Sequence, residues 1–389
     1  TDWIIAHVHV GALAWNGFLS FGMIYWLIPR MTKTKLFSEK LANFHFWIGT
    51  LGIILYSLPM YVAGFTQASM WKQFKPDGGA LQYGNFLETV TELMPMYWMR
   101  AVGGTLYLTG VIVLVYNIIR TVRQGSPVEN ELVEAPALAV ISPNRLKGEK
   151  LHSWLERKPV QFMLLTTVAI LIGGLVQILP TILVKSNIPV ISSVKPYTPL
   201  ELQGRDLYIR EGCVGCHSQS VRPFRSEVER YGPQSKAGEF VYDHPFLWGS
   251  KRTGPDLLRV GGKYNDNWHF NHFWNPQSIS AGSIMPGYKW LFDNEAMDIS
   301  MTQKKMEAMV TLGVPYTPAQ VANAQKDLRA QAITIEESLK NDPDFVKSYE
   351  ESKKKAVAKG EKFVPMNERE IIALIAYMQR LGTDIKVKK

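Results

Sequence analysis

Cysteine is almost absent from this sequence, because its 389 residues include only Cys213 and Cys216. His217 follows directly, so the two cysteines belong to the pattern C-x-x-C-H. A zinc site would need further soft ligands at matching spacing, and there is no second C-x-x-C. A thioredoxin-like dithiol is the other alternative, but it would not need His217 and would sit in an α/β pattern.

The C-x-x-C-H pattern is the attachment signature of a c-type haem. Each thiol can form a thioether to the porphyrin, and the adjacent imidazole can bind the iron as the proximal ligand. We therefore predict one covalently bound haem c, attached at Cys213 and Cys216 with His217 on the iron.

Charged side chains are nearly missing from several long apolar runs. A helix needs about 20 mainly apolar residues to cross the hydrocarbon core of a membrane. The stretches 3–28, 44–65, 96–119 and 160–184 meet this requirement, and Arg100 is the one charge inside the last three. We predict four transmembrane helices, so membrane topology explains the net charge of +9 better than nucleic-acid binding does.

The connections between these helices predict their orientation. The first connection carries four Lys or Arg residues against Glu39 alone, the third is also basic, and the second, 67–95, is mixed. The positive-inside rule places the first and third connections in the cytoplasm. Everything after the fourth helix then lies on the periplasmic side of a bacterial inner membrane, which is the side on which haem c is attached.

The sequence suggests four consecutive parts. Residues 1–125 hold the first three helices, 126–158 a cytoplasmic linker with Pro and Gly, 159–186 a transmembrane anchor, and 197–389 a periplasmic cytochrome c domain. The chain opens on Thr1 inside an apolar run without a signal peptide, so we expect a fragment or a processed product.

Two helices are predicted to frame the cytochrome c domain. Residues 200–212 lead into the haem motif, and 368–381 carry an apolar stripe at helical spacing. Small c-type cytochromes are built by crossing such terminal helices beside the haem. The Lys-rich region 333–365 is predicted to be a solvated helical excursion.

Met285 is the candidate for the sixth iron ligand. It stands in the run Ile-Met-Pro-Gly-Tyr, far enough after the haem motif for the chain to return to the ring. A thioether ligand raises the reduction potential, although a packing methionine is the alternative in a chain with 15 of them. Pro255 is a second candidate, since its carbonyl oxygen could accept a hydrogen bond from Nδ1 of His217 and orient the ring; an ordinary turn is the alternative.

The first apolar run contains His7 and His9. Residues two apart on a helix point about 200° from each other, so these imidazoles cannot chelate one metal but can bind two cofactors on opposite sides. A histidine inside a membrane span is costly and is a functional hypothesis by default. Two satisfied core histidines are the alternative. The remaining histidines lack a defensible partner spacing and are predicted to be structural: His45, His152, His244, His269 and His272.

Two parts of the chain resemble a cbb3-type cytochrome c oxidase of the haem–copper superfamily. Residues 1 to about 125 are similar to the last three helices of its catalytic subunit, and residues from about 158 to 382 to its membrane-anchored mono-haem cytochrome c subunit. The runs that carry the resemblance are 1–9, 21–29, 204–206, 210–225 and 242–257. The linker between the two parts is then a fusion joint.

The resemblance implies an all-α membrane protein with a class I-like cytochrome c domain, and it implies roles for the histidine pair. His7 would be the proximal ligand of haem b3, where oxygen is reduced, and His9 an axial ligand of the low-spin haem b. Cys213, Cys216 and His217, with Met285 as sixth ligand, would hold the haem c that feeds electrons to haem b. The implied partners are lipid, a c-type cytochrome donor and a di-haem cytochrome c subunit, with no nucleic acid.

The family's copper B histidines, its cross-linked tyrosine and the second ligand of haem b have no match in this sequence. This chain alone is therefore not expected to reduce oxygen, and the resemblance implies the C-terminal part of a longer fused subunit. Two alternatives stay open: a membrane-anchored electron carrier without catalysis, and a relative of nitric oxide reductase.

Overall fold

The computed structural model describes residues 1–126, 144–184 and 189–386, and within these ranges it is helical with no β-strand. Four helical segments are long and apolar enough to cross a membrane, which confirms the predicted all-α membrane class. The chain forms two compact units, one made of Thr1–Ser126 with Ile191–Lys389 and the other of Pro127–Val190.

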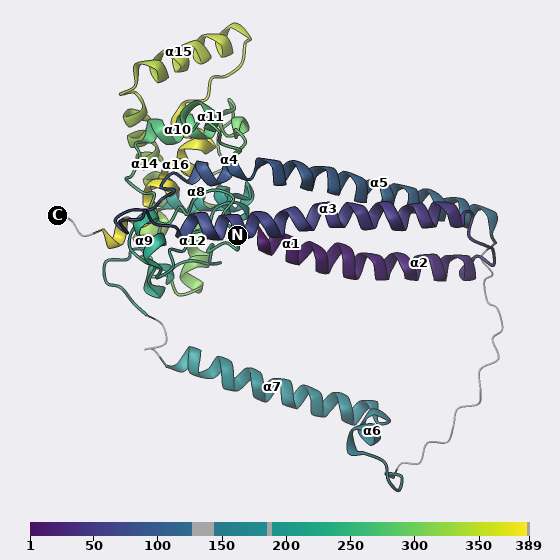
Figure 1. The fold of residues 1–389 in the computed structure, drawn as a ribbon. Coiled ribbons are helices and arrows are strands. Elements are labelled where there is room, and N and C mark those ends of the chain that lie inside the picture. The colour runs from purple at the N-terminus through teal and green to yellow at the C-terminus, as the bar shows by residue number, and fades with distance from the viewer. Residues whose placement is uncertain (127–143, 185–188, 387–389) are drawn as a thin grey trace. The chain divides into compact units, whose positions relative to one another are not determined.

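Three long helical segments lie side by side in the first unit (Figure 1). The first of them consists of α1 (Trp3–His9), a π-helical stretch (Val10–Gly17) and α2 (Phe18–Met31). The other two are α3 (Glu39–Lys72) and α5 (Met94–Gln124). The π-helical turns start directly after His9, and such irregularities in a helix are frequent at functional sites.

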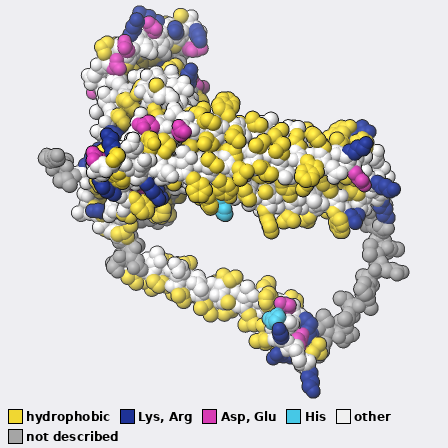
Figure 2. Space-filling view, viewed as in Figure 1, with side chains coloured by type: hydrophobic (Ala, Val, Ile, Leu, Met, Phe, Trp, Pro, Cys, Tyr) yellow, Lys and Arg dark blue, Asp and Glu magenta, His cyan; other side chains and the backbone are white. Residues whose placement is uncertain are grey.

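Two glycines allow α3 and α5 to approach closely. A Cβ added to Gly52 would lie 2.7 Å from the backbone nitrogen of Tyr107, and one added to Gly103 would lie 2.5 Å from that of Tyr56. Small residues at such crossings let membrane helices pack backbone to backbone. The face of this bundle visible in Figure 2 is mostly apolar, with Lys and Arg gathered at the end where α2 stops and α3 begins.

The connection expected at 67–95 contains more helix than the sequence indicated. α3 continues to Lys72, and a short helix, α4 (Phe86–Glu92), forms inside the connection. Asn85 caps α4, because its side chain accepts from the backbone of Leu87 at 3.0 Å while the Glu88 carboxylate accepts from the backbone of Asn85 at 3.3 Å. This reciprocal capping box stabilises the first turn.

The second unit contains α6 (Leu151–Glu156) and α7 (Pro159–Leu183), which is the fourth predicted span. Nearly all residues of α7 are exposed within the unit, and a helix that is apolar on every face is typical of a membrane span. Residues 127–143 of the predicted linker, 185–186 of the predicted anchor and the last three residues of the predicted cytochrome c domain lie outside the described residues.

The rest of the first unit is a helical domain that starts at Ile191. Its elements are α8 (Pro199–Arg210), η3 (Cys213–Gly215), α9 (Arg225–Tyr231), η4 (Ala237–Phe240), α10 (Asp266–Trp274), α11 (Pro276–Ile279), η5 (Lys289–Phe292), α12 (Thr302–Thr311), α13 (Pro318–Ala322), α14 (Ala324–Leu339), α15 (Pro343–Ala358), η6 (Met366–Glu368), α16 (Glu370–Arg380) and η7 (Thr383–Ile385).

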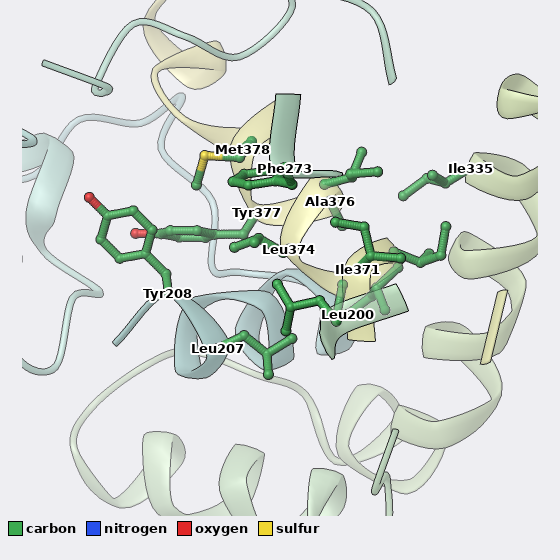
Figure 3. Close-up of a cluster of buried hydrophobic side chains, with 14 of the residues drawn as sticks. Leu200, Leu207, Tyr208, Phe273, Ile335, Ile371, Leu374, Ala376, Tyr377 and Met378 are labelled. Atoms are coloured by element: carbon green, nitrogen blue, oxygen red, sulfur yellow. The ribbon is translucent and has the colours of Figure 1, made fainter. Parts of the chain in front are cut away.

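The two predicted framing helices are α8 and α16, and they cross at Gly204. A Cβ at this position would lie 1.9 Å from the carbonyl oxygen of Ala373, so only glycine permits the contact. Figure 3 shows Leu200 and Leu207 of α8 facing Leu374 and other apolar residues of α16. This crossing forms the centre of the domain's core and fixes the helix that leads into the haem motif.

The prediction of a solvated excursion at 333–365 is wrong for α14. Leu328, Ala332, Ile335 and Leu339 are all buried in the same core as α8 and α16. They lie at helical spacing on one face, and that face starts before residue 333, where the predicted excursion began. Most of the Lys-rich helix α15 is exposed, as expected.

Candidate functional site

The C-x-x-C-H motif is shaped by the turn that ends α8. Gly212 adopts a left-handed conformation with φ of +72°, which lets the chain leave the helix abruptly. Cys213–Gly215 then form a single 3₁₀ turn. The backbone nitrogen of His217 donates to the carbonyl oxygen of Cys213 at 2.9 Å, so the buried thiol and the imidazole are held on one compact loop.

The loop 252–257 positions the ring of His217. Its Nδ1 lies 2.8 Å from the carbonyl oxygen of Pro255. The backbone nitrogens of Thr253 and Gly254 both donate to the carbonyl oxygen of Cys216, at 2.9 and 3.0 Å. A Cβ on Gly254 would lie 2.3 Å from Cε1 of the ring, so the glycine lets the loop lie against the imidazole.

The protonation of His217 suits a metal ligand. Burial lowers the pKa of this histidine, and the hydrogen bond to the Pro255 carbonyl offsets only part of that effect. A neutral ring that donates from Nδ1 directs the lone pair of Nε2 away from the loop. His217 therefore offers one nitrogen to an iron atom.

A buried group of ion pairs fixes the same loop to the motif. Arg252 lies 2.9 Å from the carboxylate of Glu227 and 3.4 Å from that of Asp256. Ser218 donates to Asp256 at 2.6 Å and accepts from Arg252 at 2.7 Å. Burial alone would raise the pKa of Glu227, but the hydrogen bonds from Arg252 and Arg222 outweigh it and lower the pKa to about 2.

A cavity of about 390 Å³ opens beside the motif and is lined by Cys213, Cys216, His217 and Met285 together. The structure thus brings the two thiols, the proposed proximal ligand and the proposed sixth ligand to one space. Much of the remaining wall is apolar or aromatic, as a porphyrin requires. The apolar and aromatic wall residues include Phe86, Leu87, Val90, Tyr208, Leu257, Phe273, Ile284, Tyr288 and Met378.

The residues around this cavity fit a covalently attached haem better than either alternative. Burial raises the pKa of the Cys213 thiol to about 12, whereas a redox dithiol needs a thiol with a lowered pKa. Over the described residues, His, Cys, Asp and Glu do not gather into a group of three that could hold zinc. Three residues that line the cavity have a buried polar atom without a hydrogen-bond partner among the described residues, namely Nη2 of Arg230, Nε2 of His269 and Nδ1 of His272.

The sequence predicts His269 and His272 to be structural, yet both line this cavity. They sit three residues apart on α10 and so share a face of the helix. Trp268 stacks on His272 with 4.6 Å between ring centroids, and Tyr264 stacks on Trp268 at 3.9 Å. The i, i+3 spacing of the two histidines was a signal in the sequence, but nothing there indicated a cavity.

His7 and His9 occupy different surroundings at the start of the bundle. His7 is exposed and stacks on Trp3, with 5.2 Å between ring centroids. His9 is half-buried against Tyr56 of α3, and its Nδ1 lies 2.7 Å from the carbonyl oxygen of Ile5 in its own helix. That bond leaves Nε2 of His9 available to a metal.

A buried polar group that the sequence did not reveal anchors the helix with the histidine pair. Asp2 is 1% exposed, and its carboxylate accepts from Gln67 of α3 at 2.8 Å and from Tyr97 of α5 at 2.7 Å. The backbone nitrogen of Asp2 donates back to Gln67. These bonds fix the start of α1 against both neighbouring helices.

Two family comparisons match different parts of the chain. Residues 152–385 match the family described as "Cytochrome C oxidase, mono-heme subunit/FixO". Residues 1–106 match "Cytochrome C and Quinol oxidase polypeptide I". The chain belongs to the mono-haem subunit family of cytochrome c oxidases. It is a cbb3-type haem–copper oxidase polypeptide in which a catalytic-subunit segment precedes the mono-haem part, and both families imply haem cofactors.

Curated relatives agree with the match at the N-terminal part. The chain is 47% identical over 123 residues to the cytochrome c oxidase subunit 1 homolog of Agrobacterium tumefaciens, covering 31% of this chain and 22% of the relative. It is 39% identical over 130 residues to the cbb3-type cytochrome c oxidase subunit CcoN1 of Stutzerimonas stutzeri, covering 33% of this chain and 27% of the relative. A nitric oxide reductase polypeptide of Stutzerimonas stutzeri matches at 27% identity over 138 residues, covering 34% and 27%. The chain thus spans about a quarter of the length of these relatives. Its identity to the two oxidase subunits is higher than its identity to the nitric oxide reductase subunit, which favours the oxidase.

Proposed function

We propose that this chain supplies both the electron-entry haem c and two haem-iron ligands of a cbb3-type terminal oxidase complex. In that complex haem c accepts electrons from a c-type cytochrome and passes them to low-spin haem b and on to haem b3 and copper B, where oxygen is reduced to water with proton translocation. The observation that carries the proposal is the cavity that brings Cys213, Cys216, His217 and Met285 together.

Each proposed haem c residue has a separate task. The thiols of Cys213 and Cys216 attach the porphyrin, His217 binds the iron through Nε2, and Met285 is the sixth ligand. The carbonyl oxygen of Pro255 lies 2.8 Å from Nδ1 of His217. This hydrogen bond keeps the ring in one orientation and makes Nε2 more basic, and therefore a stronger ligand for the iron. The ion pairs of Arg252 with Glu227 and Asp256 stabilise this loop.

The bundle carries the second pair of ligands. His7 is proposed as the proximal ligand of haem b3 and His9 as one axial ligand of haem b. Their contacts support this division, because His9 packs towards α3 while His7 is exposed on the bundle. The copper B ligands and the second haem b ligand would come from other residues of the complete oxidase.

The connection between α3 and α5 supports electron transfer between the two parts. Phe86, Leu87 and Val90 of α4 line the cavity with the haem motif. Arg225 and Arg230 donate to the carbonyl oxygens of Gly78 and Gly84, at 2.7 and 3.0 Å. A haem held in this cavity would lie against the bundle's own residues, and a short path is what electron transfer needs.

The proposal is tested by following haem b reduction in the purified oxidase complex after mixing with a reduced c-type cytochrome. Replacing both Cys213 and Cys216 with Ala should remove haem c from this chain and slow haem b reduction at least tenfold. A Ser220→Ala variant, outside the cavity, serves as control. Haem b reduction at the wild-type rate without this haem c would contradict the proposal.

A further inference from the structure

Arg230, on α9, lines the haem cavity and has one unsatisfied donor. Its Nη1 donates to the carbonyl oxygen of Gly84 at 3.0 Å, whereas Nη2 is buried and has no hydrogen-bond partner among the described residues. The ion pairs found in the described ranges do not include Arg230. Arg230 is half-buried, so a carboxylate bound at Nη2 would offset the cost of removing part of the guanidinium from water.

The other arginine of the cavity wall is already satisfied. Arg259 contacts Glu239 through both terminal nitrogens, at 2.6 and 2.9 Å, and its Nε donates to the carbonyl oxygen of Pro233 at 3.0 Å. Its charge is therefore neutralised within the domain. Arg230 also lines the cavity, but its Nη2 has no hydrogen-bond partner among the described residues.

His269 is a second residue of the cavity wall with an unsatisfied polar atom. Its side chain is 2% exposed, and its Nε2 has no hydrogen-bond partner among the described residues. Burial lowers the pKa of His269 to about 4, so the ring is neutral at physiological pH and carries one N–H. A buried polar atom without a partner costs free energy unless a ligand satisfies it.

We propose that Arg230 and His269 bind the propionate groups of haem c. The inference rests on the proposed haem c site, and it adds an anion-binding side to that site. Propionates are the only charged groups on the porphyrin edge, and carboxylates accept charge-assisted hydrogen bonds from guanidinium and N–H donors. Arg230 and His269 both line the cavity that the two thiols, His217 and Met285 share, and each has an unsatisfied polar atom.

Arg230 also links the haem-bearing domain to the three-helix bundle through Gly84. A substitution there would therefore remove a contact between the two parts as well as an anion contact. Arg225 provides a matched control, because it donates to Gly78 in the same connection but does not line the cavity. Its side chain is 60% exposed, so its loss should leave the haem surroundings unchanged.

The test is a spectroelectrochemical titration of haem c in the oxidase complex purified with Arg230→Met, Arg225→Met, His269→Phe or Arg230→Lys. Loss of a cation beside the haem favours the oxidised iron, so Arg230→Met should lower the midpoint potential. We expect at least a tenfold change in the redox equilibrium, which is ~59 mV for one electron. Arg225→Met should have the midpoint potential of the wild type. Arg230→Lys keeps the positive charge, so its midpoint potential should lie closer to that of the wild type than to that of Arg230→Met.

Resonance Raman spectra supply the second measurement, since the propionate bending modes report hydrogen bonding directly. These modes should shift in Arg230→Met and in His269→Phe, and not in Arg225→Met. Full haem c content with an unmoved potential and unmoved propionate modes in both variants would overturn the inference and leave the haem c site intact. A wild-type complex with no haem c on this chain would instead overturn the proposed function. If Arg230→Met does not assemble, the propionate modes of His269→Phe and Arg230→Lys decide the question.

Discussion

At the scale of single residues, two segments that are far apart in the sequence position His217, namely the C-x-x-C-H motif and the loop at Pro255. Its neighbours in the C-x-x-C-H motif follow from a local pattern, which is why they could be predicted. Pro255 lies 38 positions after His217, so no local pattern joins the two residues. Pro255 could be predicted only because an iron-binding imidazole usually has a hydrogen bond at its other ring nitrogen. Arg230 and His269 could not be predicted, because their part in the site depends on which buried donors the folded chain leaves without partners.

Met285→Ala tests the proposed sixth ligand. We expect haem c to stay attached through Cys213 and Cys216, while its midpoint potential falls by more than ~59 mV because the thioether no longer favours reduced iron. Redox titration of the purified complex measures this change. His272 lines the same cavity and could replace the lost ligand, so the double variant Met285→Ala/His272→Phe should lose the low-spin spectrum altogether. An unchanged potential in the single variant would remove Met285 as ligand.

His9→Ala tests the division of roles in the histidine pair. Nε2 of His9 is free because Nδ1 faces the carbonyl oxygen of Ile5 at 2.7 Å. We expect the variant to lose the low-spin haem b signal in the absorption and EPR spectra, with haem c retained. The matched variant His7→Ala should instead remove the high-spin haem b3 signal. Persistence of the low-spin signal in His9→Ala would contradict the assignment.

At the scale of helices, the apolar runs predicted the four spans well because a membrane imposes length and composition together. Of the two framing helices, α16 was predictable from its apolar stripe and α8 from its place directly before the haem motif. α14 was missed because its stripe begins upstream of the Lys-rich region that dominated the interpretation. The π-helical turns after His9 carry no sequence pattern that distinguishes them from an ordinary helix.

Glu227→Gln tests the ion-pair group on α9. The pKa of Glu227 is lowered to about 2, so its pairing stabilises the fold above about pH 4.5 and this stabilisation is lost as the pH falls towards 2. We expect the variant to lose up to about 3 kcal/mol at neutral pH and to show a flatter decline on acidification. Thermal loss of the haem c Soret circular dichroism measures this.

Glu229→Gln is the control for that change, since Glu229 lies two positions further on α9 and pairs with the exposed Arg225. Exposed pairs contribute about 0–1 kcal/mol, so this variant should resemble the wild type. Equal effects of the two substitutions, or a wild-type pH profile in Glu227→Gln, would show that the buried group does not stabilise the loop at His217.

At the scale of the whole molecule, the sequence predicted a fusion of two oxidase parts, and two family matches on either side of residues 107–151 agree with it. The way in which the parts meet could not be predicted. Residues of α4, from the bundle, line the cavity of the haem motif, although more than 120 positions separate them in the sequence. Such a contact depends on the packing of α9 against the α3–α5 connection, which no local pattern encodes.

The most direct test of the fused oxidase is a pyridine haemochrome spectrum of the oxidase complex that contains this chain. We predict two b haems for each haem c on this polypeptide, after the c haems of partner subunits are subtracted. Haem c without any haem b would contradict the prediction. The chain would then be an anchored electron carrier, in which His7 and His9 have only a structural role.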